Sequence, residues 1–171
     1  SGKTSLVEKT IEMLKNRIRI MVIEGDVQTD LDAQRIDRLG VAVAQIVTHG
    51  ACHLEASLVR KALQSLDAQN AQLLIIENVG NLVCPAGYDL GEAIKIVIIS
   101  VTEGDDKPLK YPAMFRNASV CVINKIDLLP YVRCDIDALQ QAASLINPQL
   151  IFFKTSCITD EGIKEWCSWL E

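Results

Sequence analysis

The chain has 171 residues, a length that suits one α/β domain, and its 49% apolar and 23% charged residues exclude a disordered chain. Its 17 basic and 22 acidic residues leave a net charge of −5, which argues against a protein that binds nucleic acid by electrostatics. No apolar run reaches the roughly 18 residues of a membrane helix, and no signal peptide opens the chain, so the sequence predicts no membrane partner.

Short apolar runs alternate with helical patterns along the whole chain. This alternation predicts an α/β fold of three layers, with a doubly wound, mostly parallel sheet between helices. We expect one domain over residues 1–171. Strands are expected at 18–23, 41–47, 73–76, 96–99, 120–123 and 150–153, and helices at about 3–16, 53–67, 135–145 and 160–170.

The six cysteines are scattered through a chain that is apolar enough to fold without covalent staples. This usage indicates cytoplasmic thiols or metal ligands rather than a disulfide framework. Cys121 alternates within a predicted strand and is expected in the core. Cys134 and Cys167 have no evident partner, so small buried or surface thiols are the expectation for both.

The first residues read Ser1-Gly2-Lys3-Thr4-Ser5, which is the second half of the phosphate-binding pattern G-x-x-x-x-G-K-[ST]. Gly2 lets backbone amides approach the phosphates, Lys3 brings a cation to the β/γ oxygens, and the Thr4 hydroxyl is a ligand for Mg²⁺. Because the first glycine of the pattern is missing, we expect the natural protein to extend further at its N-terminus. The alternative is a helix N-terminus with a chance Gly-Lys-Thr.

Asn124-Lys125-Ile126-Asp127 directly follows a predicted strand and has the N-K-x-D pattern by which GTPases recognise guanine. The Asp127 carboxylate can accept hydrogen bonds from the N1–H and N2–H₂ groups of guanine, which adenine lacks, while Asn124 and Lys125 brace the loop. Ser156 and Cys157 follow the last strand, where such proteins offer a backbone amide to the guanine oxygen. The alternative is a polar turn, but together with Gly-Lys-Thr the pattern favours GTP or GDP as ligand.

Two carboxylates lie at strand ends, Asp26 after the first strand and Glu77 after the third. The C-terminal ends of parallel strands meet at one edge, so both can join Thr4 in holding Mg²⁺. Glu77 begins an E-x-x-G pattern whose Gly80 amide is a candidate γ-phosphate contact. Asn81 follows Gly80 where Ras-like GTPases have Gln, which predicts slow hydrolysis. A helix cap is the alternative role for each acid.

Cys52 and His53 open a predicted helix, and Cys84 lies in the loop that follows Gly80. Thiolate and imidazole together are a ligand set for Zn²⁺ or Ni²⁺, and both loops leave the same edge of the predicted sheet. His49 is a candidate fourth ligand or a solvated loop residue. The spacing alone does not separate a metal site from three unrelated residues.

Four sequence blocks together carry a resemblance to a known family, over essentially the whole chain. They are GDVQTDLDAQRI at 25–36, ACHLEA at 51–56, ENVGNLVCP at 77–85 and NKID at 124–127. In these blocks the chain resembles HypB, the family of hydrogenase nickel-incorporation GTPases. The related urease accessory family UreG carries Cys-Pro-His where this chain has Cys-His, which favours HypB.

The resemblance implies a P-loop NTPase of the SIMIBI class that hydrolyses GTP to GDP and phosphate. It further implies a GTP-dependent homodimer that holds Ni²⁺ or Zn²⁺ through Cys52, His53 and Cys84. The implied partners are a HypA-like nickel metallochaperone and the [NiFe]-hydrogenase large-subunit precursor. The chain departs from the family in lacking the first P-loop glycine and the N-terminal Cys- or His-rich nickel store of some relatives.

Two other functions stay open at this point. One is a UreG-like GTPase for urease maturation. The other is a regulatory GTP switch without a metal role, in which Cys52, His53 and Cys84 are structural. A kinase is disfavoured because the sequence shows no phosphoacceptor signal and kinases of this class do not usually carry N-K-x-D.

Overall fold

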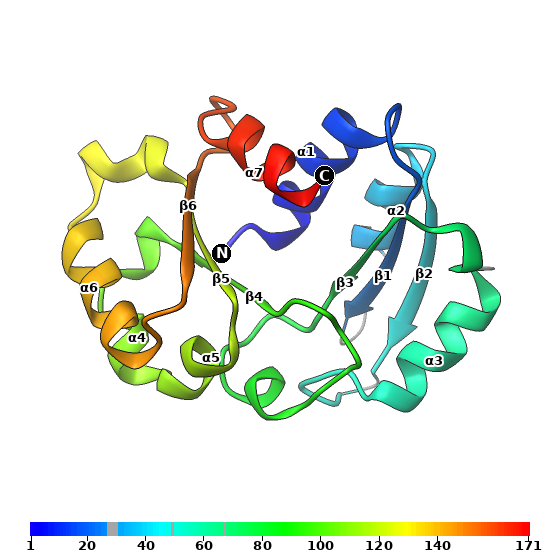
Figure 1. Cartoon of the computed structure of the whole chain (residues 1–171), viewed down its shortest axis with the longest axis horizontal. Helices are drawn as coiled ribbons and strands as arrows, with labels where there is room; N and C mark the ends of the chain where they lie inside the picture. Colours follow the sequence, from blue (N-terminus) through cyan, green and yellow to red (C-terminus); the bar gives the residue numbers. More distant parts are fainter. Residues whose placement is uncertain (27–30, 49, 67) are drawn as a thin grey trace. The chain divides into compact units, whose positions relative to one another are not determined.

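The computed structural model describes residues 1–26, 31–48, 50–66 and 68–171. All of its strand pairs are parallel, and they form two three-stranded sheets of order β2-β1-β3 and β4-β5-β6 (Figure 1). The chain divides into two compact units, one of Thr4–Gly91 and one of Ser1–Lys3 with Glu92–Glu171. The α/β class with parallel strands is confirmed, and the single domain over 1–171 stays a prediction.

The unit of Thr4–Gly91 contains the first sheet. Its elements are α1 (Lys3–Leu14), β1 (Ile20–Asp26), α2 (Leu31–Asp37), β2 (Ala42–Val47), α3 (Ala56–Ser65) and β3 (Leu73–Glu77), with short 3₁₀ turns at Ala68–Asn70 and Cys84–Gly87. Helix α1 buries a stripe spaced three and four residues apart, as an amphipathic helix does. The stripe comprises Thr4, Val7, Ile11 and Leu14.

The core of this unit joins β1 and β2 to α3, which lies beside β2 (Figure 1). Leu54 is fully buried in this cluster, just after the Cys52-His53 pair. A Cβ on Gly25 would approach the Leu54 side chain to 2.7 Å, so the glycine makes room for it. Burying a leucine stabilises the fold by about 1.5–3 kcal/mol, so Leu54 anchors the loop that carries the predicted metal ligands to the end of β1.

Helix α2 is held to α1 by an ion-pair network. Arg35 pairs with Glu8 at 2.5 Å and with Asp32 at 2.9 Å. The hydrogen bonds that Arg35 donates to the Glu8 carboxylate raise the pKa of Arg35. These contacts give Asp32 and Arg35 of the 25–36 block a structural role, whereas residues 27–30 of that block lie outside the described residues.

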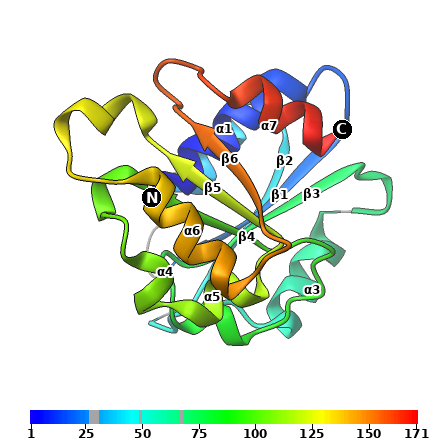
Figure 2. The ribbon, with the colours of Figure 1, turned by 60° about the vertical axis from the view of Figure 1, so that its left-hand side comes forward.

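The second unit contains β4 (Ile96–Ser100), β5 (Val120–Asn124) and β6 (Ile151–Thr155). All five residues of the central strand β5 are buried. Helices α4 (Lys107–Lys110), α5 (Pro112–Asn117) and α6 (Ile136–Ile146) pack against one another (Figure 2). Helix α7 (Ile163–Leu170) packs on β6, where Phe153 meets Trp166 edge to face at 5.4 Å. Within the described ranges, no helix has both the length and the apolar content of a membrane crossing.

The structure confirms all six predicted strands, but a predicted helix begins later than expected and three short helices were not predicted. The helix predicted from His53 begins only at Ala56, because Glu55 is extended and the Leu54 amide is bound by the Asn78 side chain. Helices α2, α4 and α5 were not predicted. Each has seven residues or fewer, too few turns to show a 3.6-residue period, and the two shortest have a proline in their first turn.

Candidate nucleotide and metal sites

The predicted guanine-binding residues come together around Asn124, at the end of β5. Its Nδ2 donates to the Ser1 carbonyl at 3.1 Å, and its Oδ1 accepts from the Thr155 hydroxyl at 3.1 Å and from the Cys157 thiol at 3.7 Å. A Cβ on Gly2 would lie 2.7 Å from Asn124 Nδ2, so the glycine permits this close approach. Asn124 therefore ties the first residues of the chain to the loop after β6.

Asp127 is oriented by the same loop. The Ser156 hydroxyl donates to Asp127 Oδ1 at 2.6 Å, and Ser156 Oγ accepts from the Ile158 and Thr159 amides. Lys125 has φ +62°, in the left-handed region, where a non-glycine residue costs about 1–2 kcal/mol. Backbone strain of this size concentrates at functional sites. Of the five residues predicted to bind guanine, Asn124, Asp127, Ser156 and Cys157 take part in these hydrogen bonds. The fifth, Lys125, directly follows Asn124.

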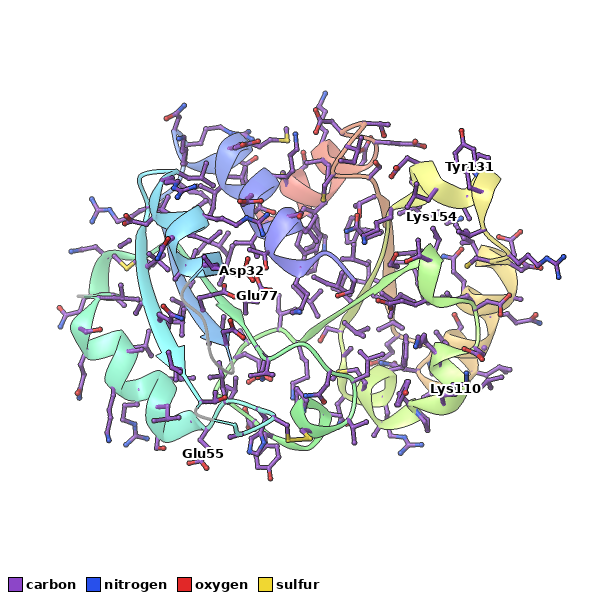
Figure 3. The ribbon with its side chains drawn as sticks, turned by 180° about the vertical axis from the view of Figure 1, so that it is seen from behind. Asp32, Glu55, Glu77, Lys110, Tyr131 and Lys154 are labelled. Atoms are coloured by element: carbon purple, nitrogen blue, oxygen red, sulfur yellow. A yellow bond between two sulfur atoms is a disulfide. The ribbon has the colours of Figure 1, made fainter. Side chains whose placement is uncertain are left out.

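The predicted Mg²⁺ residues Thr4 and Glu77 are also brought together. Thr4 Oγ1 donates to Oε1 of Glu77 at 2.9 Å, and both side chains are buried. Glu77 is labelled in Figure 3. Asp26 is the last residue of β1 rather than a residue beyond the strand. Glu77 ends β3, and since β1 and β3 are parallel neighbours, Asp26 and Glu77 lie at the same edge of the sheet.

The remaining phosphate candidates lie at the start of α1 and in the loop after β3. Gly2 has φ +86°, and α1 begins at the next residue, Lys3. The amides of a helix N-terminus attract anions, and Lys3, Thr4 and Ser5 form its first turn here. Gly80 lies in the loop after β3, three residues beyond Glu77.

Cys52 and Cys84, 32 residues apart, are joined by a disulfide with a Cα–Cα distance of 6.1 Å (Figure 3). The prediction that no cysteines pair is therefore wrong for these two. The sequence predicted that their loops leave one edge of the sheet, but not that the two sulfurs meet. The pairing brings the two predicted thiol ligands of the metal together.

His53 lies beside this pair. Its Nδ1 is 3.7 Å from Cys52 Sγ, and its ring stacks on Tyr88 with centroids 3.6 Å apart. His49, the candidate fourth ligand, lies outside the described residues. With Cys52 and Cys84 joined, no group of three or more His, Cys, Asp or Glu among the described residues is arranged to hold a metal ion.

The other four cysteines form no disulfide. Cys121 is buried as predicted, and burial raises its pKa to about 12. Burial, followed by the charges of Asp105 and Asp135, also raises the pKa of Cys134. Cys167 is buried in α7. None of these features favours a metal role for Cys121, Cys134 or Cys167.

Glu24 is a buried carboxylate next to Glu77 that the sequence patterns did not single out. It is only 2% exposed and lies opposite Glu77 in the β1–β3 register. A buried carboxylate is uncommon unless it is paired or binds a cation. The sequence offers one indication of this burial, because Glu24 is a charged residue directly after the apolar run 20–23.

Comparison with known proteins identifies relatives over the whole chain. Residues 1–154 match the family model of the CobW/HypB/UreG nucleotide-binding domain. The chain is 53% identical to a hydrogenase maturation factor HypB of Azotobacter vinelandii, of which it spans 56%, while all of this chain is covered. It is 44% identical to a probable hydrogenase maturation factor HypB of Methanocaldococcus jannaschii, spanning 77% of that protein and again all of this chain.

Solved structures show the same relationship. A crystal structure of HypB from Helicobacter pylori in complex with nickel matches with a TM-score of 0.93 and 38% identity, over 99% of this chain and 80% of that one. HypB from Archaeoglobus fulgidus matches with a TM-score of 0.91 and 41% identity, over 99% and 82%. The signal recognition particle 54 kDa protein of Aeropyrum pernix, in complex with GDP, shares the fold alone, with a TM-score of 0.65 and 15% identity over 91% of this chain and 39% of that one.

Proposed function

Because this chain belongs to the CobW/HypB/UreG family, in its HypB branch, we propose that it is a GTP-hydrolysing nickel carrier in the maturation of [NiFe]-hydrogenase. The observation that carries the proposal is the meeting of Cys52, His53 and Cys84 on loops next to the strand ends of β1 and β3. The same strand ends carry the acidic residues that we assign to Mg²⁺. Nucleotide chemistry and metal chemistry therefore share one framework.

We assign the phosphates and Mg²⁺ to the start of α1 and to the ends of β1 and β3. The Thr4–Glu77 hydrogen bond supports this, because a hydroxyl and a carboxylate are oxygen ligands of the kind that Mg²⁺ binds. Asp26 would complete the acidic set. When bound, Mg²⁺ neutralises the charge that develops on the phosphates. Lys3 supplies a further positive charge, and the Gly80 amide contacts the γ-phosphate.

We assign the base to Asn124, Lys125, Asp127, Ser156 and Cys157. The Ser156 hydroxyl holds the Asp127 carboxylate in place, and Asn124 braces the loop through Thr155 and Cys157. Asp127 accepts from the two guanine N–H groups, and the amides of the 156–157 turn bind the guanine oxygen. An adenine base would leave the carboxylate without its donors, which is how the site discriminates.

The cargo metal binds the reduced form of the cysteine pair. Two molecules of a small thiol such as glutathione reduce the Cys52–Cys84 disulfide to two protein thiols and are themselves oxidised to their disulfide. Deprotonated, the protein thiols provide two thiolates beside the His53 imidazole, a soft ligand set that suits Ni²⁺ or Zn²⁺. The relative whose structure contains nickel, at 38% identity, supports nickel as the cargo.

Binding of GTP is proposed to bring two copies of the chain together, and hydrolysis resets the complex. The proposed partners are a HypA-like metallochaperone as the nickel donor and the hydrogenase large-subunit precursor as the acceptor. A second function is supported by one relative, a "hydrogenase/urease maturation factor HypB" of Helicobacter hepaticus, which is 42% identical over all of this chain and of which the chain spans 72%. Urease maturation is therefore the second candidate.

The proposal is tested with reduced protein and two readouts. Wild-type protein is expected to bind Ni²⁺ in equilibrium dialysis and to release phosphate from GTP slowly. Cys84→Ala should lose Ni²⁺ binding and keep hydrolysis, whereas Lys3→Ala should lose hydrolysis and keep its circular dichroism spectrum. Cys134→Ala, at a half-buried thiol in the other unit, is the matched control and should change neither readout. Unchanged Ni²⁺ binding in Cys84→Ala would remove Cys84 from the metal site, and no Ni²⁺ binding by wild-type protein would favour the regulatory GTP switch.

A further inference from the structure

The side chain of Asn81 bridges the two cysteine loops. Its Nδ2 donates to the Cys52 carbonyl at 2.6 Å, and its Oδ1 accepts from the amides of Val83 at 3.0 Å and Cys84 at 2.8 Å. One side-chain amide thus contacts the backbone of both cysteines. The two ends of the amide bind different loops. Nδ2 donates to the Cys52 loop, and Oδ1 accepts from the Cys84 loop, to which Asn81 itself belongs.

A second asparagine of the same segment holds the Cys52-His53 pair from its other side. Asn78 Oδ1 accepts from the amides of Leu54 at 3.0 Å and Val79 at 2.8 Å. Leu54 is fully buried against Gly25 of β1. Residues 52–54 are therefore bound at both ends by residues 78–81, which directly follow Glu77.

The imidazole is held by the Cys84 loop as well. Tyr88 follows the 3₁₀ turn that begins at Cys84, and its ring lies nearly parallel to that of His53, with an interplanar angle of 18°. Cys52, His53 and Cys84 are therefore all contacted by side chains of residues 78–88.

Reduction removes the covalent link between the loops, and metal binding requires that reduction. In the dithiol form the Asn81 bonds, the Asn78 bonds and the ring stack remain as links between the loops. Of these, only the Asn81 side chain contacts the backbone of both cysteine residues directly. Asparagine is suited to this task, because its amide donates and accepts at once.

We propose that Asn81 is a positioning residue for metal binding: it holds the Cys52 and Cys84 thiols of the reduced protein at the separation that a metal ion requires. The inference rests on the proposed metal role of Cys52, His53 and Cys84. Asn81 adjoins Gly80, so the same side chain links the proposed γ-phosphate contact to the thiols. It also explains why an asparagine occupies the place after Gly80, since here its amide binds backbone groups of the cysteine loops.

Two variants separate the functions of this amide. Asn81→Asp keeps an oxygen that accepts from Val83 and Cys84 but loses the donor to the Cys52 carbonyl. Asn81→Ala loses both. Asn70→Ala, at an exposed asparagine of the Ala68–Asn70 turn in the same unit, is the matched control.

The first measurement is Ni²⁺ affinity of the phosphine-reduced protein, by competition with a chromophoric chelator, together with the thiolate-to-nickel absorption band. Loss of an outer partner of a metal site lowers affinity by about 10- to 100-fold. We expect a loss in this range, with a shifted band, for Asn81→Ala and Asn81→Asp, and no change for Asn70→Ala.

The second measurement needs no metal. Equilibration with oxidised and reduced glutathione converts the two protein thiols to the disulfide and one glutathione disulfide to two glutathione molecules, so atoms and electrons balance. The equilibrium constant gives the effective concentration of one thiol at the other. We expect both Asn81 variants to lower it about tenfold or more.

The two measurements distinguish the two claims. If wild-type protein binds no Ni²⁺, the proposed function fails, and the glutathione equilibrium still decides whether Asn81 sets the separation of the thiols. If wild-type protein binds Ni²⁺, and both variants match it in affinity, absorption band and effective concentration, the role of Asn81 is overturned. Asn81→Asp is nearly isosteric, so it keeps the test decisive should Asn81→Ala fold poorly.

Discussion

The Ser156 hydroxyl orients the Asp127 carboxylate, and the proposed role of Asp127 in base recognition leads to a prediction at the residue scale. In Asp127→Asn the new amide donates where the guanine N–H groups also donate. Each hydrogen bond lost to a charged group costs about 1.5–3 kcal/mol, so GTP binding should weaken by about 10- to 150-fold per bond. Xanthosine triphosphate, which has a carbonyl oxygen at that position, should bind more tightly than to wild type.

Competition titrations with GTP, ATP and xanthosine triphosphate check this exchange of preference. Asp137→Asn, at an exposed carboxylate in the first turn of α6, is the matched control and should keep the wild-type order. A variant at Asp127 that still prefers GTP as strongly as wild type would remove that carboxylate from base recognition.

Cys121 allows a prediction about stability against pH. Its pKa is 9.0 in the unfolded chain and about 12 in the folded one, so the folded state keeps the proton longer. The associated stability is complete below pH 9 and is lost as the pH rises toward 12. At pH 10.5 the loss is about 2 kcal/mol, because each pH unit above 9 contributes about 1.36 kcal/mol.

Urea unfolding of wild type and Cys121→Ala at pH 8 and pH 10.5, with reductant, isolates this contribution. Contributions that the two proteins share cancel in the difference. The stability advantage of wild type should shrink by about 2 kcal/mol at the higher pH. A difference that does not change with pH would mean that the thiol ionises as easily in the folded protein as in the unfolded chain.

At the scale of elements, the turn between β6 and α7 positions Ser156 and Cys157. Gly162 ends this turn with φ +71°, and a Cβ there would lie 1.9 Å from the Lys154 carbonyl oxygen. Gly162→Ala must therefore shift the backbone of β6 or α7. We expect a loss of stability of more than about 1 kcal/mol and weaker GTP binding.

Gly40→Ala separates backbone strain from steric clash. Gly40 has a similar φ of +76°, but a Cβ there would meet nothing within 4 Å. Thermal unfolding and GTP titration of both variants should show a small stability loss for Gly40→Ala, with GTP binding unchanged. Equal effects of the two substitutions on GTP affinity would mean that the turn does not position the base-binding residues.

At the scale of the whole molecule, the proposed function requires GTP and nickel to affect each other. Residues 78–84 join the proposed γ-phosphate contact to the thiols through Asn78 and Asn81. If the GTP-bound loop changes the separation of the thiols, Ni²⁺ affinity must change, and by linkage Ni²⁺ must change GTP affinity by the same factor. A typical coupling of 1–3 kcal/mol predicts a factor of about 5 to 150.

Dissociation constants for Ni²⁺ on reduced protein, with GDP and with a non-hydrolysable GTP analogue, measure this coupling. Light scattering on the same samples reports the mass, which we expect to double with the analogue. Cys84→Ala should abolish the metal response but leave the nucleotide-dependent mass intact. Equal Ni²⁺ affinities and equal masses in the two nucleotide states would exclude GTP-driven delivery.

Much of this protein follows from short-range patterns in its sequence. Apolar runs of four to seven residues predicted all six strands, because parallel strands covered by helices need apolar side chains. The N-K-x-D pattern and the turn after the last strand singled out residues that the structure joins through the contacts of Asn124 and Asp127. These features depend on residues close in sequence or on the regular alternation of strands and helices.

Tertiary structure alone decided how distant loops meet. Cys52 and Cys84 are paired across 32 residues, and the roles of Asn78 and Asn81 depend on backbone groups of another loop. No periodicity in the sequence encodes such contacts, because they follow from the parallel order β2-β1-β3, which brings the loops after β2 and β3 to one edge. The same register sets the buried Glu24 opposite Glu77, since only strand pairing determines which carboxylates become neighbours.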